Sequence, residues 1–196
     1  MKPAKKATLA KLTLASGIGL ASFSAYAAVT VPTYDIEAGK AIVEANCAAC
    51  HGLDGMSPVP TQPNLGGQNI KYLYKQLVDF KTKARRNGIM EAQLAGLTQQ
   101  DLANLAGYYA SRTPWTPGYG NKATVAEATK LYLGGDKTRG VIPCSGCHDP
   151  KGAGNAYAGF PRLGGQHAAY LATHVHLFRA AGRADDVSSD TEERAN

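Results

Sequence analysis

One sequence pattern occurs twice in this chain, and it constrains the fold more than any other feature. Segment 63–73 reads P-N-L-G-G-Q-N-I-K-Y-L, and segment 161–171 reads P-R-L-G-G-Q-H-A-A-Y-L. A pattern that recurs at a fixed offset marks a repeated structural unit. The sequence therefore predicts two similar lobes arranged in tandem.

Each copy of the repeat is preceded by two cysteines and a histidine in the pattern C-x-x-C-H, at 47–51 and at 144–148. This spacing is typical of c-type haem attachment. Two thiols three positions apart on a helical turn can each add to one vinyl group of a single porphyrin, and the next imidazole then reaches the iron. We therefore expect two covalently bound haem c groups. The predicted attachment residues are Cys47, Cys50, Cys144 and Cys147, and the predicted iron ligands next to them are His51 and His148.

Other roles for the four cysteines fit this spacing less well. Two disulfides are the ordinary expectation for an exported protein, but each close pair is followed at once by a histidine. A thioredoxin-like redox site expects a strand–helix setting, which is not visible in the sequence. A structural zinc site would leave both histidines unexplained. A zinc-binding module is kept as an alternative that a mass measurement can test.

A proline follows each motif at a distance that supports the haem interpretation. Pro63 lies 12 residues after His51, and Pro161 lies 13 residues after His148. The second ring nitrogen of a metal-bound histidine usually donates to a carbonyl or a carboxylate. In small class I cytochromes c, a proline carbonyl at about this distance accepts that bond. We expect the same part for the two prolines.

The sixth ligand of the first iron is predicted from the methionines. A thioether opposite the histidine raises the reduction potential of a haem. Met1 belongs to the predicted signal peptide, and Met56 is too close to the attachment site to cross to the other haem face. Met90 lies on a predicted loop between two helical segments. It is the expected distal ligand of the first haem.

The second iron has no equivalent methionine. The repeat offset carries Met90 onto Ser188, and no methionine follows Met90 in the sequence. His167, His174 and His176 are the nearest candidates, and we favour a helix-surface role for the last two. The second iron could instead have an open or water-bound position, or the sequence could be truncated or frame-shifted.

Hydrophobic periodicity predicts an all-α fold. After each repeat, apolar residues recur at i, i+3, i+7 and i+10, which is one stripe of an amphipathic helix. These stripes are Ile70, Leu73, Leu77 and Phe80, and Ala168, Leu171, Val175 and Phe178. Shorter stripes precede the two motifs, at Ala38, Ala41, Ile42 and Ala45, and at Val125, Ala128 and Tyr132. Each lobe is short for a hydrophobic core of its own, so an enclosed porphyrin is expected to complete it.

A final helix is predicted in the first lobe alone. Thr98 and Asp101 form a capping-box-like pattern at its start, and Thr113-Pro114 ends it. Its buried stripe is Leu102, Leu105, Ala106 and Tyr109. The second lobe is expected to lack this helix and to be loosely folded without haem or a partner.

The predicted domain organisation is a signal peptide, two lobes and a tail. Segment 1–27 has a basic start, a short apolar stretch and an A-Y-A site that ends at Ala27, as in a secretory signal peptide, and it directs the mature chain to the periplasm. The other predicted segments are lobe 1 at 28–113, a turn-rich linker at 114–122, the incomplete lobe 2 at 123–184, and a polar, disordered tail at 185–196.

The charge of the chain gives no support to nucleic-acid binding. The chain has 21 Lys and Arg against 15 Asp and Glu. Four of these lysines lie in segment 1–27, which leaves 17 basic residues and a formal charge of +2. The apparent basicity therefore belongs to a segment that is predicted to be removed.

The signal peptide, the two C-x-x-C-H sites and the duplicated P-x-L-G-G-Q-x-x-x-Y-L run resemble the dihaem cytochrome c4 family, over nearly the whole mature chain to about Arg183. The resemblance implies two tandem class I cytochrome c folds that face each other, with haem propionates near the lobe contact. It also implies an iron with His and Met ligands in each lobe. The matching residues are Cys47, Cys50, His51 and Met90 in the first lobe and Cys144, Cys147 and His148 in the second.

The function implied by this resemblance is that of a periplasmic electron carrier and not of an enzyme. The carrier would take electrons from a quinol-oxidising complex to a terminal oxidase, with these complexes as its redox partners, and the role allows peripheral membrane association. The alternative is the haem subunit of a dehydrogenase or a peroxidase-like enzyme. In that case an open second haem would favour peroxide or small-gas chemistry.

Overall fold

The structure is a computed structural model that describes residues 29–116, 118 and 120–180. The predicted signal peptide and the predicted polar tail lie outside these residues. The described part of the chain is helical, with two isolated β-bridges and no strand, which confirms the predicted all-α fold. None of the helices in these ranges is both long and apolar enough to cross a membrane.

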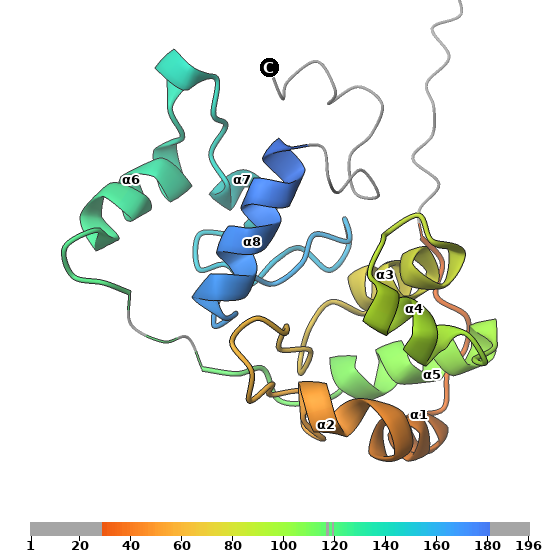
Figure 1. Ribbon diagram of the computed structural model, residues 1–196. Helices are drawn as coiled ribbons and strands as arrows, with labels where there is room; N and C mark the ends of the chain where they lie inside the picture. The colour runs from red at the N-terminus through yellow and green to blue at the C-terminus, as the bar shows by residue number, and fades with distance from the viewer. Residues whose placement is uncertain (1–28, 117, 119, 181–196) are drawn as a thin grey trace, which may run out of the picture.

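The predicted lobe 1, of which the structure describes residues 29–113, is built around four helices, α1 (Ile36–Ile42), α3 (Ile70–Thr82), α4 (Gly88–Leu94) and α5 (Gln99–Ala110). Each begins at a polar residue whose side chain accepts hydrogen bonds from the first free backbone N–H groups. These caps are Asp35, Asn69, Asn87 and Thr98. The cap of α5 is the predicted capping box of Thr98 and Asp101. Figure 1 shows α5 crossing lobe 1, where it packs against both α1 and α3.

The core of lobe 1 lies where α5 meets α1 and α3. The stripe that was predicted for α5 is buried, and so are Leu73 and Phe80 of the stripe predicted for α3. Each such leucine or phenylalanine side chain contributes about 1.5–3 kcal/mol when it leaves water. Lobe 1 therefore has a substantial apolar core of its own.

The buried face that we predicted for the helix before the first motif is wrong at two of its four residues, whereas Ile42 packs against the core as expected. Ala41 and Ala45 are exposed, whereas Gly39 and Val43 are buried. Because Gly39 has no side chain, the backbone of α5 at Asn104 lies directly against it. A periodicity that counts apolar side chains does not register a glycine as a contact residue.

This close crossing gives a stability prediction. A methyl group at Gly39 would overlap the Asn104 carbonyl, which is backbone and cannot move aside. Gly39→Ala should therefore lower the free energy of unfolding by about 1–3 kcal/mol, as overpacked substitutions do. Gly134→Ala is the matched control, because a methyl group there meets no atom within 4 Å. Denaturant unfolding of both variants checks this, and equal midpoints would contradict it.

The predicted lobe 2, of which the structure describes residues 123–180, contains α6 (Val125–Gly134), the 3-10 helix η2 (Lys137–Arg139), α7 (Ser145–His148) and α8 (Ala168–Arg179). None of these four helices has a buried residue. The stripe predicted for α8 is wrong at Ala168, which is exposed, and at Val175, which is 65% exposed. In lobe 2, α6, α7 and α8 follow one another as α1, α2 and α3 do in lobe 1. The lobe 2 helices do not form a buried core like that of lobe 1.

The exposed surface of α6 matches the surface that α5 covers in lobe 1. Segment 38–40, A-G-K, aligns with segment 128–130, A-T-K, which pairs Val43 with Leu133. Val43 is 0% exposed, whereas Leu133 is 48% exposed. Val125 of the predicted stripe is exposed as well. The predicted burial of this stripe is therefore wrong, because the packing partner that lobe 1 provides has no counterpart in the described part of lobe 2.

The two lobes meet through the repeated loops and the start of the linker. Trp115 is buried, and its ring packs so closely on Gly165 of lobe 2 that a side chain at Gly165 would overlap it. Arg162 of lobe 2 lies over the same ring. In Figure 1, α8 lies between lobe 1 and α6. The lobe contact is thus formed by the loops that follow the two C-x-x-C-H motifs, by α8 and by Trp115.

Candidate haem-attachment sites

The first C-x-x-C-H motif lies across a change in helix geometry. Helix α1 opens into a π-helical turn, η1 (Val43–Cys47), which is followed directly by α2 (Ala48–His51). Single π-turns inside helices are frequent at functional sites. Cys47 is half-buried and Cys50 is exposed, and neither is in a disulfide. Both thiols are therefore available for a covalent bond to a ligand.

His51 is buried and oriented as an iron ligand must be. Its Nδ1 donates to the Pro63 carbonyl at 3.0 Å, which confirms the bond predicted from the spacing. A proton on Nδ1 leaves the Nε2 lone pair for a metal. Burial lowers the pKa of His51, although the bond to Pro63 opposes this shift. The imidazole is therefore held neutral, which is the form that binds a metal.

The surroundings of the motif favour neutral groups. Burial raises the pKa of the Cys47 thiol to about 11, and the neighbouring Cys50 adds to the shift. Burial also raises the pKa of the Tyr109 phenol, with Cys47, Tyr108 and Asp54 adding to it. An apolar site with neutral side chains suits the face of a porphyrin.

Two tyrosines of α5 hold the turn that follows His51. Tyr108 donates from its hydroxyl to the Leu53 carbonyl at 3.0 Å, and Tyr109 donates to the Gly52 carbonyl at 3.2 Å. Gly52 has a φ of 74°, and a side chain there would overlap the Met56 carbonyl. The final helix of lobe 1 therefore positions the histidine turn as well as filling the core.

Met90 lies in α4 and not on a loop, so the local structure predicted for it is wrong. Asn87 caps α4 and accepts from the Met90 backbone N–H at 3.0 Å. The Met90 side chain is half-buried and packs against the same hydrophobic cluster as Cys47 and Ala48. The Met90 thioether, which lies on a capped helical turn, and the Cys47 thiol are thus placed against one apolar cluster.

The second motif repeats the geometry of the first. Its cysteines are also free, and its histidine ends α7. His148 Nδ1 donates to the Pro161 carbonyl at 2.9 Å, which confirms the second predicted bond. The two imidazoles are therefore fixed in the same tautomer by equivalent carbonyls of the repeat.

The turn after His148 is held differently from its counterpart in lobe 1. Tyr132 of α6 donates to the Asp149 carbonyl at 2.7 Å, so α6 does in lobe 2 what α5 does in lobe 1. Asp149 takes the place of Gly52 and has φ 69° and ψ 148°. This region is normally left to glycine, and other residues in it cost on the order of 1–3 kcal/mol. The second site is therefore held at the expense of local backbone strain.

The three histidines that were candidates for the second iron have different surroundings. His167 Nε2 donates to the Ser57 carbonyl of lobe 1 at 3.0 Å. His174 lies against the Tyr170 ring, and its Nε2 is 3.4 Å from an Arg85 nitrogen of lobe 1. His176 is exposed. The predicted helix-surface role is therefore confirmed for His176 and wrong for His174, which belongs to the lobe contact.

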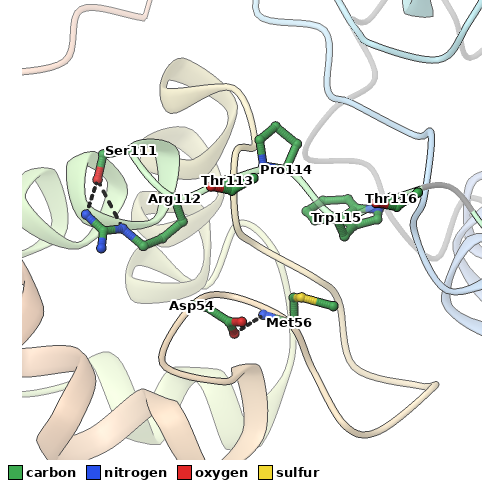
Figure 2. Close-up of a pocket in the computed structure, with 8 residues that line it drawn as sticks. All are labelled: Asp54, Met56, Ser111, Arg112, Thr113, Pro114, Trp115 and Thr116. Atoms are coloured by element: carbon green, nitrogen blue, oxygen red, sulfur yellow. Dashed lines mark hydrogen bonds between the residues drawn. The ribbon is translucent and has the colours of Figure 1, made fainter.

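A surface hollow of about 610 Å³ lies apart from the haem-attachment residues, where α5 ends and the linker begins. Figure 2 shows Arg112 turned back onto Ser111, with Asp54 bonded to the Met56 backbone. The Arg112 guanidinium also stacks on the Tyr108 ring at 4.5 Å. Both charged groups that line the hollow are thus engaged within lobe 1.

The donor set at each motif fits a covalently attached haem. Two free thiols share one helical turn, and an imidazole with its Nδ1 bonded to a proline carbonyl and its Nε2 available follows them. His and Met are the axial ligands of cytochromes c, and Met90 supplies the second type near the first motif. No three His, Cys, Asp or Glu side chains in the described ranges are arranged to hold a metal ion directly.

Comparisons with known proteins agree with this geometry. Residues 36–112 match the cytochrome c domain family. The chain is 44% identical over 161 residues to cytochrome c4 of Stutzerimonas stutzeri, which covers 78% of this chain and 76% of that protein. The crystal structure of reduced recombinant cytochrome c4 from Pseudomonas stutzeri is similar with a TM-score of 0.76 and 42% identity, over 80% of this chain and 86% of that one. A thiosulfate dehydrogenase electron acceptor of Thiomonas intermedia is 36% identical over 145 residues, 72% of this chain and 66% of that protein.

Proposed function

Because the chain belongs to the cytochrome c4 family, we propose that it carries electrons in the periplasm from a quinol-oxidising complex to a terminal oxidase. Membership of the family makes the chain an electron-transfer protein with covalently attached haem c and not an enzyme. The observation that supports the proposal most directly is the pair of C-x-x-C-H turns whose histidines both donate to a proline carbonyl. The periplasmic location is supported by the predicted signal peptide at 1–27.

We assign the ligands of the two haems from the geometry of the two motifs. The haem of lobe 1 would be attached through Cys47 and Cys50, with His51 and Met90 on its iron. The haem of lobe 2 would be attached at the second motif, through Cys144 and Cys147, with His148 on its iron. Haem c supplies a one-electron ferric/ferrous couple when it is bound.

The protein's own part is to hold the iron ligands still. The Pro63 and Pro161 carbonyls fix the two imidazoles, and the tyrosines on α5 and α6 fix the turns after them. Met90 is fixed by the cap of its helical turn. Ligands that are held still between oxidation states would favour fast electron transfer, and the Met90 thioether would leave no open position on the first iron.

A rapid-mixing experiment with respiratory membranes tests the proposed direction of transfer. The oxidised protein should be reduced by membranes that contain a quinol-oxidising complex and reoxidised by membranes that contain a terminal oxidase. Both reactions are followed through the absorbance of the bound haem. Omitting quinol is the control, and failure of reduction with quinol present would contradict the proposal.

A different electron donor is the competing outcome. One similar protein is named as the electron acceptor of a thiosulfate dehydrogenase. Mixing the oxidised protein with a thiosulfate dehydrogenase and thiosulfate therefore belongs in the same experiment. Reduction in this mixture, without reduction by quinol, would replace the proposed donor while keeping the role of electron carrier.

A further inference from the structure

The glutamines of the two P-x-L-G-G-Q loops are exchanged between the lobes. The Gln166 side chain of lobe 2 accepts from the Asn64 N–H at 2.9 Å and donates to the Asn64 carbonyl at 3.0 Å. The Gln68 side chain of lobe 1 accepts from the Arg162 N–H at 2.7 Å and donates to the Arg162 carbonyl at 2.9 Å. Each amide thus brackets one residue of the opposite lobe, and the two brackets are related by the internal repeat.

The bracketed residues directly follow the prolines that hold the two histidines. The peptide group between Pro63 and Asn64 accepts from His51 at its carbonyl and donates to Gln166 at its N–H. The peptide group between Pro161 and Arg162 does the same for His148 and Gln68. A single peptide group therefore separates each predicted iron ligand from a side chain of the other lobe.

Hydrogen bonds on the two ends of one peptide group reinforce each other. A bond accepted from the N–H polarises the group and makes its carbonyl a stronger acceptor, and such cooperativity is larger where water is excluded. Gln68, which brackets Arg162, and Asn64, which is bracketed by Gln166, are each 5% exposed, so both brackets involve a residue that is shielded from water. A stronger acceptor draws the imidazole Nδ1 proton more firmly and makes the imidazole a more basic ligand. A more basic ligand stabilises ferric over ferrous iron and lowers the reduction potential.

We propose that Gln68 and Gln166 are positioning residues that tune the haem of the opposite lobe, so that the contact between the lobes sets the potential of each iron. This inference rests on the proposed ligation of the two irons by His51 and His148. On this proposal, the two reduction potentials between which electrons exchange depend on how the lobes are docked. When the lobes separate, each glutamine loses its hydrogen bonds to the residue after the other lobe's proline, and its effect on that lobe's histidine ends.

Glutamine is the residue type that this geometry requires. Its amide has one acceptor and one donor at the end of a flexible stem, which matches the N–H and carbonyl of a single residue. Each glutamine oxygen accepts a further bond from the backbone N–H of its own next residue, Asn69 at 2.8 Å and His167 at 3.0 Å. Leucine has a similar size but supplies none of these bonds.

The experiment compares Gln166→Leu and Gln68→Leu with the intact protein that carries both haems. The reduction potential of each haem is followed through its own paramagnetically shifted proton resonances. In Gln166→Leu, the ferrous/ferric equilibrium of the lobe 1 haem should shift toward ferrous by about two- to fivefold, with a smaller change in lobe 2. The shift is modest because the lost hydrogen bond acts on the iron only through the proline peptide and the histidine, and no iron ligand is removed. In Gln68→Leu, the larger shift toward ferrous should occur in the lobe 2 haem. A tenfold shift of a one-electron couple corresponds to about 59 mV.

Asn69→Ser is the matched control. The Asn69 amide also crosses the lobe contact, by donating to the Asn155 carbonyl at 3.1 Å and to the Phe160 carbonyl at 3.4 Å, but it does not bond the Pro63–Asn64 or the Pro161–Arg162 peptide group, which the two histidines contact. Serine keeps the helix cap that Asn69 provides for α3. Both potentials should stay within the error of the wild type. A control that shifts the potentials as much as the glutamine variants would reduce the effect to loosened docking and overturn the proposal.

A second readout separates tuning from misfolding. The Asn64 amide proton should move upfield in Gln166→Leu, and the Arg162 amide proton should move upfield in Gln68→Leu, while haem content and the absorption spectrum remain those of the wild type. Unchanged potentials in variants with wild-type spectra would overturn the inference alone. If instead the spectrum of the wild-type protein showed no histidine ligand on the iron, the proposed ligand assignment would be overturned.

Discussion

Replacing Met90 with alanine should open the sixth position of the first haem. A six-coordinate iron with His and Met ligands does not bind external ligands readily, and loss of the thioether leaves only His51 on the iron. The reduced variant should bind one more equivalent of carbon monoxide per chain than the wild type. Its lobe 1 potential should fall by on the order of 0.1 V, within the roughly 0.8 V over which axial ligands set haem potentials.

Met56→Ala is the matched control for this experiment. Met56 is 52% exposed and lies in the turn after the first motif, and it is not among the residues of the cluster against which Met90 packs. Its replacement should leave carbon monoxide binding and both potentials unchanged. If Met90→Ala bound no additional carbon monoxide, or if Met56→Ala did so instead, the assigned distal ligand would be wrong.

Lobe 2 should depend on its haem far more than lobe 1 does. None of the lobe 2 helices has a buried residue, whereas lobe 1 buries a cluster in which α3 and α5 supply most members. Each buried large apolar side chain is worth about 1.5–3 kcal/mol, so the difference approaches the whole stability of a domain, about 5–15 kcal/mol. Haem-free lobe 2 of the Cys144→Ala/Cys147→Ala variant should therefore be cleaved at least about tenfold faster than haem-free lobe 1 of a Cys47→Ala/Cys50→Ala variant, a difference of about 1.4 kcal/mol.

Limited proteolysis with mass analysis of the fragments measures this difference. The Cys47→Ala/Cys50→Ala variant is the counterpart, and it should keep more protection in its haem-free lobe because the α1–α5 contact remains. The spared lobe of each variant should be cleaved as slowly as in the wild type. Cleavage of the two haem-free lobes at equal rates would contradict the account of lobe 2.

The motifs could be located from the sequence because their chemistry needs fixed spacings. Two thiols and an imidazole on one helical turn, and a proline at a set distance, leave little freedom, and the structure confirms both histidine–proline bonds. The capping box and buried stripe of α5 were predictable for the same reason. In those places local chemistry and tertiary packing favour the same structure.

The errors fall where contacts between elements decide the outcome. The buried face of α1 is set by the approach of α5 to Gly39, which a pattern of apolar side chains does not reveal. Val175 fits an amphipathic stripe, yet α8 turns Tyr170 and His174 toward Arg85 of lobe 1 instead. Periodicity predicts a helix with two unlike faces, but it does not predict what lies opposite each face.

The sequence showed the two glutamines as part of the repeat, but it did not show that each of them contacts the opposite lobe. Gln68 and Gln166 belong to the duplicated loop, so their recurrence was the signal that could have identified them. A polar residue in a loop is ordinary, and only the docking of one lobe on the other shows which backbone groups the amides reach. Tyr132 was similarly assigned to a buried stripe, whereas its hydroxyl holds the turn after His148.

The central claim is that each lobe holds one haem through its own cysteine pair. Intact-mass measurement of the protein matured in a bacterium with haem-ligation machinery, followed by mapping of proteolytic peptides, tests this directly. The account predicts a polypeptide heavier by two haem groups, with one on the peptide that contains Cys47 and Cys50 and one on the peptide that contains Cys144 and Cys147. A bare polypeptide mass, or both cysteine pairs recovered as free thiols, would contradict it.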